Sequence, residues 1–374
     1  MNLRFTLVLC TLFIFLISCS DEPESPQFKR AVIVYMAANN NLSTNSYRDI
    51  MEMKLAANGL ADSSLIVYHH PADAAPRLFE ITPQGTERTI KTYDTCESSL
   101  SINRMNTVIH DAIAASSADT YGLVLWSHGT GWHSDSHTLN ESRTGLSPLA
   151  FGEDGVRNPV KMKITSLAKA LEDFNFDYIY FDCCHMATVE IAYELRRITP
   201  LIVGCPTELD IDGMPYDRNL PYLFSAVSNL STAINNVFEL YSRPGYYGCC
   251  ISLISTDDLD ELARVSREIL KVCAAPDNYT PVPYFRSLVM STGIFDMYHY
   301  FQALTANAPA LWAEWEKTFN RVVLKTYTSP TVFMLPATNF HGLGCNIPTP
   351  KYPITYNGYN ELQWCNDVVS TVTP

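Results

Sequence analysis

The chain has 374 residues, of which 47% are hydrophobic and 17% charged, so it can build one large core or a core domain with a smaller subdomain. Its formal net charge of -13 disfavours contact with the phosphate backbone of nucleic acids. We therefore expect no nucleic-acid partner.

The amino terminus has the features of an export signal. Residues 5–17 form an apolar run that is short for a membrane span and typical of a signal peptide. The run ends in Leu16-Ile-Ser-Cys19, which resembles a bacterial lipoprotein cleavage box with Cys19 as the lipid-modified residue. Cleavage near Ser18 or Ser20, without a lipid, is the alternative. We predict a signal peptide over residues 1–19 and an acidic tether over residues 20–29.

The predicted location follows from that signal. We expect an outer-membrane lipoprotein that faces the periplasm or the cell surface, contacts the membrane through the lipid on Cys19, and is otherwise a monomer.

Strand patterns alternate with helical patterns from residue 30 onward. Strands are predicted at 31–37, 64–69, 121–127, 178–183, 201–205 and 251–255, with a hairpin over 78–92. Helices are predicted at 46–57, 104–115, 164–174, 186–197, 223–240 and 259–273. This order predicts βαβ units, and hence an α/β fold with a mostly parallel central sheet flanked by helices.

Two segments depart from the alternation. Residues 133–163 are polar and lack a period, which predicts a long loop of functional or cleavable type. After residue 275, helical segments precede short strands near 331–335 and 342–347. We predict a core over residues 30–275 and a smaller, mainly helical carboxyl-terminal subdomain over residues 276–374 that packs on it.

The segment 178–194 reads as a buried strand that runs into a helix. Asp182, Cys183 and Cys184 fall at the junction, where the carboxyl end of the strand meets the amino end of the helix. Ligands of open α/β sheets bind at this edge. A helix dipole at this place would lower the pKa of a thiol and make it more reactive.

His128 ends another predicted strand, and Gly129 and Gly131 allow the backbone beside it to approach a ligand closely. If the two strands are neighbours, the imidazole and the thiol share a crevice, where histidine can transfer the protons that a cysteine nucleophile requires. The N–H groups of Gly129 and Cys184 are then candidate donors to an oxyanion.

Three motifs resemble the clostripain family of cysteine peptidases. They are Val34-Tyr-Met-Ala-Ala-Asn-Asn-Asn-Leu42, Ser127-His-Gly-Thr-Gly-Trp132, and Phe181-Asp-Cys-Cys-His-Met186 with Glu190-Ile-Ala-Tyr-Glu-Leu195. The resemblance implies a caspase-like fold and a catalytic dyad of His128 and Cys184. Cys183 stands where the family usually has a small residue, and it offers a second thiol. Alternation along a strand points its side chain away from that of Cys184.

The resemblance also implies polypeptide substrates cleaved after Arg or Lys, by way of a thioester. A cationic P1 side chain requires a carboxylate partner. Asp182 is the first choice, because it shares a strand face with Cys184. Asp212 in the acidic loop after the next strand is the second, and Glu208 and Asp210 are its neighbours there.

Family members mature by cleavage between the histidine and the cysteine, which implies Arg143 as the cleavage site, with Arg157 and Lys161 as alternatives. No cofactor is required for this chemistry. Calcium dependence is known in the family, but the chain has no Asp-rich loop with calcium spacing.

Two other functions fit parts of the sequence. His133-Ser-Asp-Ser-His137 suggests a metal-dependent hydrolase that uses His128, His133 and His137 with Asp135, although Gly131 just upstream favours a loop rather than a metal-binding helix. A catalytically silent lipoprotein that binds peptide or glycan is the third hypothesis, suggested by the 11% aromatic content.

Overall fold

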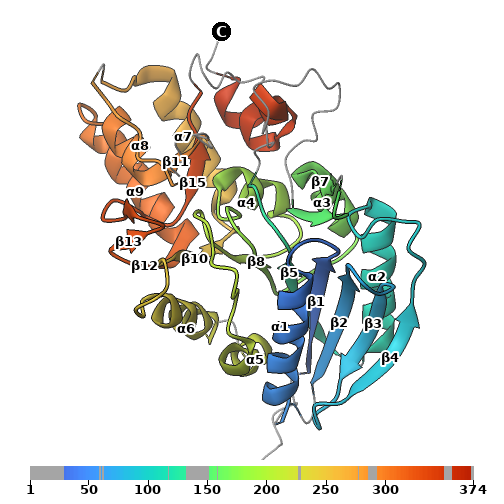
Figure 1. The fold of residues 1–374 in the computed structure, drawn as a ribbon. Helices are drawn as coiled ribbons and strands as arrows, with labels where there is room; N and C mark the ends of the chain where they lie inside the picture. Colours follow the sequence, from blue (N-terminus) through green and yellow to red (C-terminus); the bar gives the residue numbers. More distant parts are fainter. Residues whose placement is uncertain are drawn as a thin grey trace, which may run out of the picture.

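The computed structural model describes residues 29–58, 60, 63–116, 118–131, 151–157, 159–225, 229–276, 278–284, 293–348 and 356–371. The predicted signal peptide, including Cys19, lies outside these ranges. A nine-stranded sheet forms the centre of the molecule (Figure 1). From one edge to the other its strands are β12 (Val323–Thr328), β10 (Cys250–Ser255), β9 (Leu201–Gly204), β8 (Tyr178–Asp182), β5 (Thr120–Trp126), β1 (Arg30–Ala38), β2 (Ser64–Pro71), β3 (Arg77–Ile81) and β4 (Glu87–Thr92).

The middle of this sheet is parallel. Strands β9, β8, β5, β1 and β2 run in the same direction. Beyond them, β10 and β12 on one side and β3 and β4 on the other each pair antiparallel with the preceding strand. Every residue of β1 is buried, as expected when helices cover both faces of a parallel strand. The predicted α/β fold with a mostly parallel central sheet is confirmed.

Helices cover both faces of the sheet and build one apolar core on each. Side chains of β1 alternate between the cores: Ile33 and Tyr35 belong to one, and Val32 and Val34 to the other. The first core includes residues of α2 (Ile102–Ala115), α3 (Ile164–Leu171), α4 (Val189–Leu195), α7 (Leu259–Val272), α8 (Met297–Leu304) and α9 (Pro309–Val322). The second includes residues of α1 (Ser43–Ala56), α5 (Tyr216–Phe224) and α6 (Leu230–Tyr241). No helix within the described ranges is both long enough and apolar enough to cross a membrane.

Part of the segment predicted as a long loop is ordered as a hairpin of β6 (Phe151–Asp154) and β7 (Val160–Met162). The loop prediction was wrong there. Strands of three or four residues are too short to show a period, and Gly152, with φ of +81°, resembles a turn residue in the sequence.

The chain after residue 276 adds to the same sheet and also forms small elements beside it. Strand β12 pairs with β10 at the sheet edge, and this pairing crosses the predicted boundary near residue 275. The division of the chain at that boundary stays a proposal. The small elements are β11 (Ile294–Asp296), which pairs with β15 (Gly344–Asn346), β13 (Thr331–Val332), which pairs with β14 (Leu335–Pro336), and the short helices η2 (Tyr356–Glu361) and η3 (Cys365–Val369).

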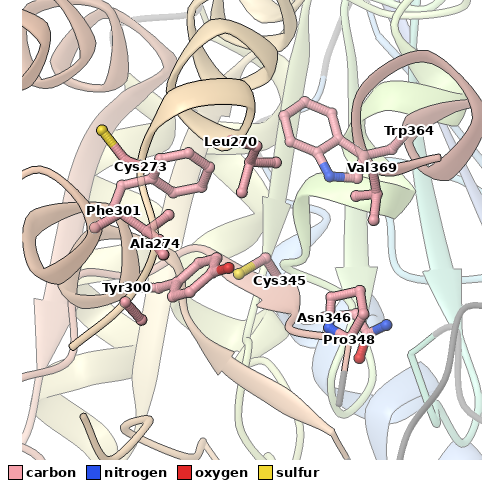
Figure 2. A pocket seen from close by; sticks show the side chains of 12 residues that line it. Leu270, Cys273, Ala274, Tyr300, Phe301, Cys345, Asn346, Pro348, Trp364 and Val369 are labelled. Atoms are coloured by element: carbon pink, nitrogen blue, oxygen red, sulfur yellow. The ribbon is translucent and has the colours of Figure 1, made fainter. Parts of the chain in front are cut away.

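A cavity of about 210 Å³ lies where α7 and α8 meet β15 and the carboxyl-terminal residues (Figure 2). Leu270, Phe301, Cys345 and Trp364 are among the residues that line it. It is therefore a space in the packing between the two predicted parts of the chain. Neither His128 nor Cys184 lines it.

Glu190 joins α4 to the carboxyl-terminal elements. Its Oε1 accepts hydrogen bonds from the Asn346 N–H at 2.7 Å and from the Tyr359 hydroxyl at 3.3 Å, while its buried Oε2 has no hydrogen-bond partner among the described residues. Burial raises the pKa of the Glu190 carboxyl to about 7.

We predict that Glu190→Gln flattens the pH dependence of stability. The unfolded glutamate loses its proton near pH 4.3 and the folded one near pH 7, so the native state binds more protons between these values and its stability falls as pH rises through them. The variant should remove about 3 kcal/mol of that decline, measured by urea unfolding at pH 4.5 and pH 7.5. Glu239→Gln, at an exposed position of α6, is the control; an equal flattening there would contradict the assignment.

Candidate active site

The ends of β5 and β8 bring the two predicted catalytic residues to one edge of the sheet. Trp126 is the register partner of Asp182, so His128 and Cys184 each follow the paired residues by two positions. Gly129 lies against the backbone of Cys184: a Cβ on Gly129 would be 2.2 Å from the Cys184 carbonyl oxygen. Only glycine permits this approach. The two strand ends therefore lie close together, as predicted.

The two neighbouring thiols have different surroundings. Cys183 is buried in an apolar core, with its Sγ 3.8 Å from the Leu125 carbonyl oxygen. Cys184 is half-buried, and so is His128. The alternation expected from the strand is therefore observed, and it leaves Cys184 as the more accessible of the two thiols.

The predicted start of the following helix was wrong. Residues 183–187 form a turn in which His185 has φ of +59°, and α4 begins only at Val189, where the Thr188 side chain accepts a hydrogen bond from the Ile191 N–H. His185 is buried, and its backbone N–H donates a hydrogen bond to the Thr207 carbonyl oxygen at 2.9 Å. This contact with the next loop holds the turn in place of a helical first turn.

The electrostatic consequence for Cys184 is also the opposite of the prediction. Burial raises the pKa of its thiol to about 11, and the hydrogen bond from the Leu209 N–H offsets only part of that effect. The Leu209 N–H lies 3.3 Å from Sγ, and the thiol lies 3.5 Å from the Leu209 carbonyl oxygen, to which it can donate. No helix begins at Cys184, so no dipole lowers the pKa there. The thiol in this structure is protonated at neutral pH.

Asn41 contacts the candidate base and was not predicted. The His128 Nε2 lies 2.6 Å from the Asn41 Oδ1. An amide oxygen can only accept, so Nε2 carries the proton and Nδ1 is the unprotonated nitrogen of the neutral ring. Asn41 follows β1, the strand beside β5. Its place inside the motif Val34–Leu42 was the available signal, but nothing in the sequence said which of three successive asparagines would face the histidine.

The two other asparagines of that motif hold the turn after β1. The Asn39 Nδ2 donates to the Asp154 Oδ1 at 2.7 Å, and the Asn40 Nδ2 donates to the carbonyl oxygens of Ala37 at 3.0 Å and Glu153 at 2.8 Å. These bonds attach the turn to β6. Asn41 is thereby presented to His128 from a fixed backbone.

Asp182 lies beneath the loop between β9 and α5, residues 205–215, which we call the 205–215 loop. Its Oδ1 accepts from the Met214 N–H at 2.9 Å and its Oδ2 accepts from the Tyr216 hydroxyl at 3.0 Å. Burial raises the pKa of this carboxyl to about 7, against the opposing effect of these two hydrogen bonds. The structure therefore holds a buried carboxyl two residues before Cys184.

Asp212 lies in the same loop, and its carboxylate is 34% exposed. Its Oδ1 is 2.7 Å from the Arg48 Nη1, and its Oδ2 accepts from the Tyr246 hydroxyl at 3.3 Å. Burial raises the pKa of the nearby Glu208. Asp210 accepts at its Oδ1 from the Asp212 N–H at 3.4 Å, which makes it part of the loop's own turn.

Several predicted residues lie outside the described ranges. These are the cleavage candidate Arg143 and the metal candidates His133, Asp135 and His137. Of the alternative cleavage sites, Arg157 is exposed and Lys161 pairs with Glu153 at 3.0 Å. Among described residues, no group of three His, Cys, Asp or Glu side chains is placed to hold a metal ion.

Comparison with known proteins points to one family. The clostripain family model matches residues 34–320. The chain is similar to the structure of a secreted C11 cysteine protease from Bacteroides thetaiotaomicron in complex with an irreversible peptide inhibitor, with 25% identity, a TM-score of 0.78, and coverage of 91% of this chain and 98% of that chain. No curated protein matches the chain significantly.

Two further structures share the architecture. An inactive zymogen C11 protease from Parabacteroides distasonis has 26% identity and a TM-score of 0.77, with coverage of 91% of this chain and 97% of that chain. A second structure of a secreted C11 cysteine protease from Bacteroides thetaiotaomicron, called iotapain, has 22% identity and a TM-score of 0.79, with coverage of 91% and 99%, and supports the fold alone.

We predict that the substrate-free protein alkylates slowly at Cys184. With a pKa of about 11, roughly one thiol in 10⁴ is ionised at pH 7, and the rate with iodoacetamide should rise about tenfold for each pH unit above that. The measurement is the rate of carbamidomethylation of Cys184 by peptide mass spectrometry from pH 7 to pH 9.5. A rate that levels off below pH 9 would contradict the raised pKa.

Proposed function

Because the chain belongs to the clostripain family and is a cysteine peptidase, we propose that it is an endopeptidase that cleaves polypeptides after Arg or Lys, with Cys184 as the nucleophile and His128 as its acid–base partner. One observation carries the assignment. The register of β5 against β8 places both side chains at the same sheet edge, half-buried, with the backbone of Gly129 in contact with Cys184. Family membership favours this chemistry over the metal-dependent and the silent alternatives.

The reaction proceeds in two stages. The Cys184 thiol transfers its proton to His128, and the sulfur attacks the substrate carbonyl carbon to form a tetrahedral oxyanion, which accepts hydrogen bonds from the N–H groups of Gly129 and Cys184. The imidazolium then protonates the leaving amine and a thioester forms. Water, deprotonated by His128, attacks the thioester and releases the acid product and the free thiol.

The raised pKa of the thiol constrains the first step. A thiol that is hydrogen-bonded to Leu209 and protonated at neutral pH is a weak nucleophile. Attack therefore requires that the thiol leave Leu209 and deliver its proton to His128 in the bound complex. The Nδ1 of His128 is the nitrogen that can receive the proton, since Nε2 donates to Asn41.

Asp182 and Asp212 are the proposed partners of the basic P1 side chain. Two observations support them. Asp212 lies in the 205–215 loop and Asp182 lies beneath it, and Asp182 is buried two residues before the proposed nucleophile. A cation that binds beside a buried carboxyl favours its ionised form, so the raised pKa of Asp182 would fall when the substrate binds.

Maturation and location complete the proposal. Cleavage after Arg143 would convert a zymogen, and one structural relative is an inactive zymogen. Export to the outer membrane with a lipid on Cys19 is proposed from the leader sequence, and one structural relative is described as secreted. Activity without a cofactor, as a monomer, is part of the same proposal.

The first test is a panel of fluorogenic peptides that differ at P1, hydrolysed by wild type, Cys184→Ala and Cys183→Ala. Cleavage after Arg and Lys should fall by about 10⁴-fold or more in Cys184→Ala and should persist in Cys183→Ala. Full activity of the Cys184→Ala protein would refute the nucleophile. Equal wild-type activity on peptides with apolar P1 residues would refute the assignment of Asp182 and Asp212.

Asn41 is proposed as a positioning residue for His128. We predict that Asn41→Ala lowers kcat on the order of 10²-fold with little change in KM, because the ring loses the contact that selects its tautomer and orientation. Asn41→Asp should restore part of kcat and move the acidic limb of the pH profile, since a carboxylate stabilises the imidazolium. Asn235→Ala, at a surface position of α6, is the control. An unchanged kcat in Asn41→Ala would remove Asn41 from the mechanism.

A further inference from the structure

Arg48, in α1, already contacts one of the two carboxylates proposed to bind the substrate's basic side chain. Its Nη1 lies 2.7 Å from the Asp212 Oδ1, and its Nε lies 3.7 Å from the Asp49 Oδ1. The guanidinium of a bound arginine substrate would make the same kind of charge-assisted contact with Asp212. The chain therefore supplies its own cation at the place where the substrate's cation is needed.

Acidic groups outnumber this cation at the site. Asp49 is completely buried. Its Oδ2 accepts a hydrogen bond from the Trp126 indole N–H at 2.8 Å, and its Oδ1 has no hydrogen-bond partner in the part of the chain that the structure describes. Burial, and next the charge of Asp182, raise the pKa of Asp49 to about 8. A second cation that enters this cluster favours the ionised forms of Asp49 and Asp182, so the cluster can accept it in addition to Arg48.

The same ion pair fixes the loop that contacts the nucleophile. Asp212 lies three residues after Leu209, whose backbone is hydrogen-bonded to the Cys184 sulfur. A second contact from α1, the Asn45 Nδ2 to the Ile211 carbonyl oxygen at 3.3 Å, holds the adjacent residue. Helix α1 therefore restrains the 205–215 loop next to the point where the loop covers the thiol.

We propose that Arg48 is a specificity-determining residue that competes, within the chain, for the subsite of the substrate's basic side chain. A substrate Arg or Lys displaces Arg48 from Asp212, and the 205–215 loop, freed at Asp212, withdraws Leu209 from Cys184. A neutral side chain cannot displace the ion pair and leaves the thiol hydrogen-bonded to the loop. The inference rests on the proposed function, and Arg48 acts in it as a positioning residue.

The test measures alkylation of Cys184 by iodoacetamide, without peptide substrate, in the presence and absence of methylguanidine. Methylguanidine carries the cation of an arginine side chain but no backbone that could cover the thiol. It should accelerate alkylation of wild type about fivefold, the factor expected when a half-exposed ion pair at the strong end of the observed range is lost. Arg48→Gln should alkylate about fivefold faster than wild type without the additive and should not respond to it.

Three further variants control the experiment. Asp212→Asn breaks the same ion pair from the loop side and should behave as Arg48→Gln does. Arg48→Lys retains a cation and should alkylate close to the wild-type rate. Arg218→Gln removes an arginine of α5 whose side chain is 44% exposed, the same as that of Arg48, and whose contact with the Asp217 carboxylate is longer, at 3.9 Å. This variant should match wild type.

The proposal is wrong if Arg48→Gln and Asp212→Asn alkylate at the wild-type rate, or if methylguanidine accelerates wild type and Arg48→Gln equally. Peptide hydrolysis then separates this inference from the proposed function. A lower KM of Arg48→Gln for Lys and Arg peptides supports competition at the subsite. If wild type shows no preference for basic P1 residues, the proposed specificity is refuted. The alkylation rates report on the Arg48 contact independently, because they need no turnover.

Discussion

The parallel pairing of β5 with β8 is the constraint on which the candidate active site depends. Two glycines of the β5 segment make this pairing sterically possible: a Cβ on Gly122 would lie 2.2 Å from the Tyr178 ring, and one on Gly129 would lie 2.2 Å from the Cys184 carbonyl oxygen. Side chains at these positions would force the strands apart or shift their register. A shift by one residue would turn Cys184 toward the apolar core and Cys183 toward the edge.

Polar contacts hold several groups at the edge of the sheet where the candidate active site lies. Asn41 is hydrogen-bonded to His128, and the Leu209 backbone is hydrogen-bonded to Cys184. The backbone N–H of His185 donates to Thr207 in the next loop. Such contacts are directional, so each side chain has one preferred orientation. The left-handed backbone of His185 is a local strain that these contacts offset, as is common near functional sites.

Burial of ionisable groups sets the chemistry of this edge. The pKa values of Cys184, Asp182 and Asp49 are all raised, because each group loses solvent and the charged form is disfavoured. At pH 7 Cys184 and Asp49 of the substrate-free site are thus mainly neutral, and Arg48 is the cation in contact with Asp49 and Asp212. The basic substrate side chain that we propose would add a second cation beside these carboxyls, which would couple substrate binding to activation of the thiol.

Much of the fold and the core of the site could be predicted from the sequence, since their signals are local. Hydrophobic periodicity marked β5 and β8, and the residues that follow each strand, His128 and Cys184, belong to short motifs. The start of α4 could not be predicted in this way. Residues 186–188 have a helical pattern, but the hydrogen bond from His185 to Thr207 of the next loop overrides the local preference.

What the sequence determined by itself was therefore the alternation of strands and helices, the family, and the two strand ends that carry the candidate catalytic residues. Only the tertiary structure decided which groups surround them. The contact of Arg48 with Asp212 joins residues 164 positions apart, and that of Asn41 with His128 joins residues 87 apart. The state of the thiol was decided in the same way, because its pKa depends on burial and on the Leu209 backbone rather than on its place after a strand. No periodicity or motif encodes such pairings, since they arise when sheet order brings distant segments to one edge.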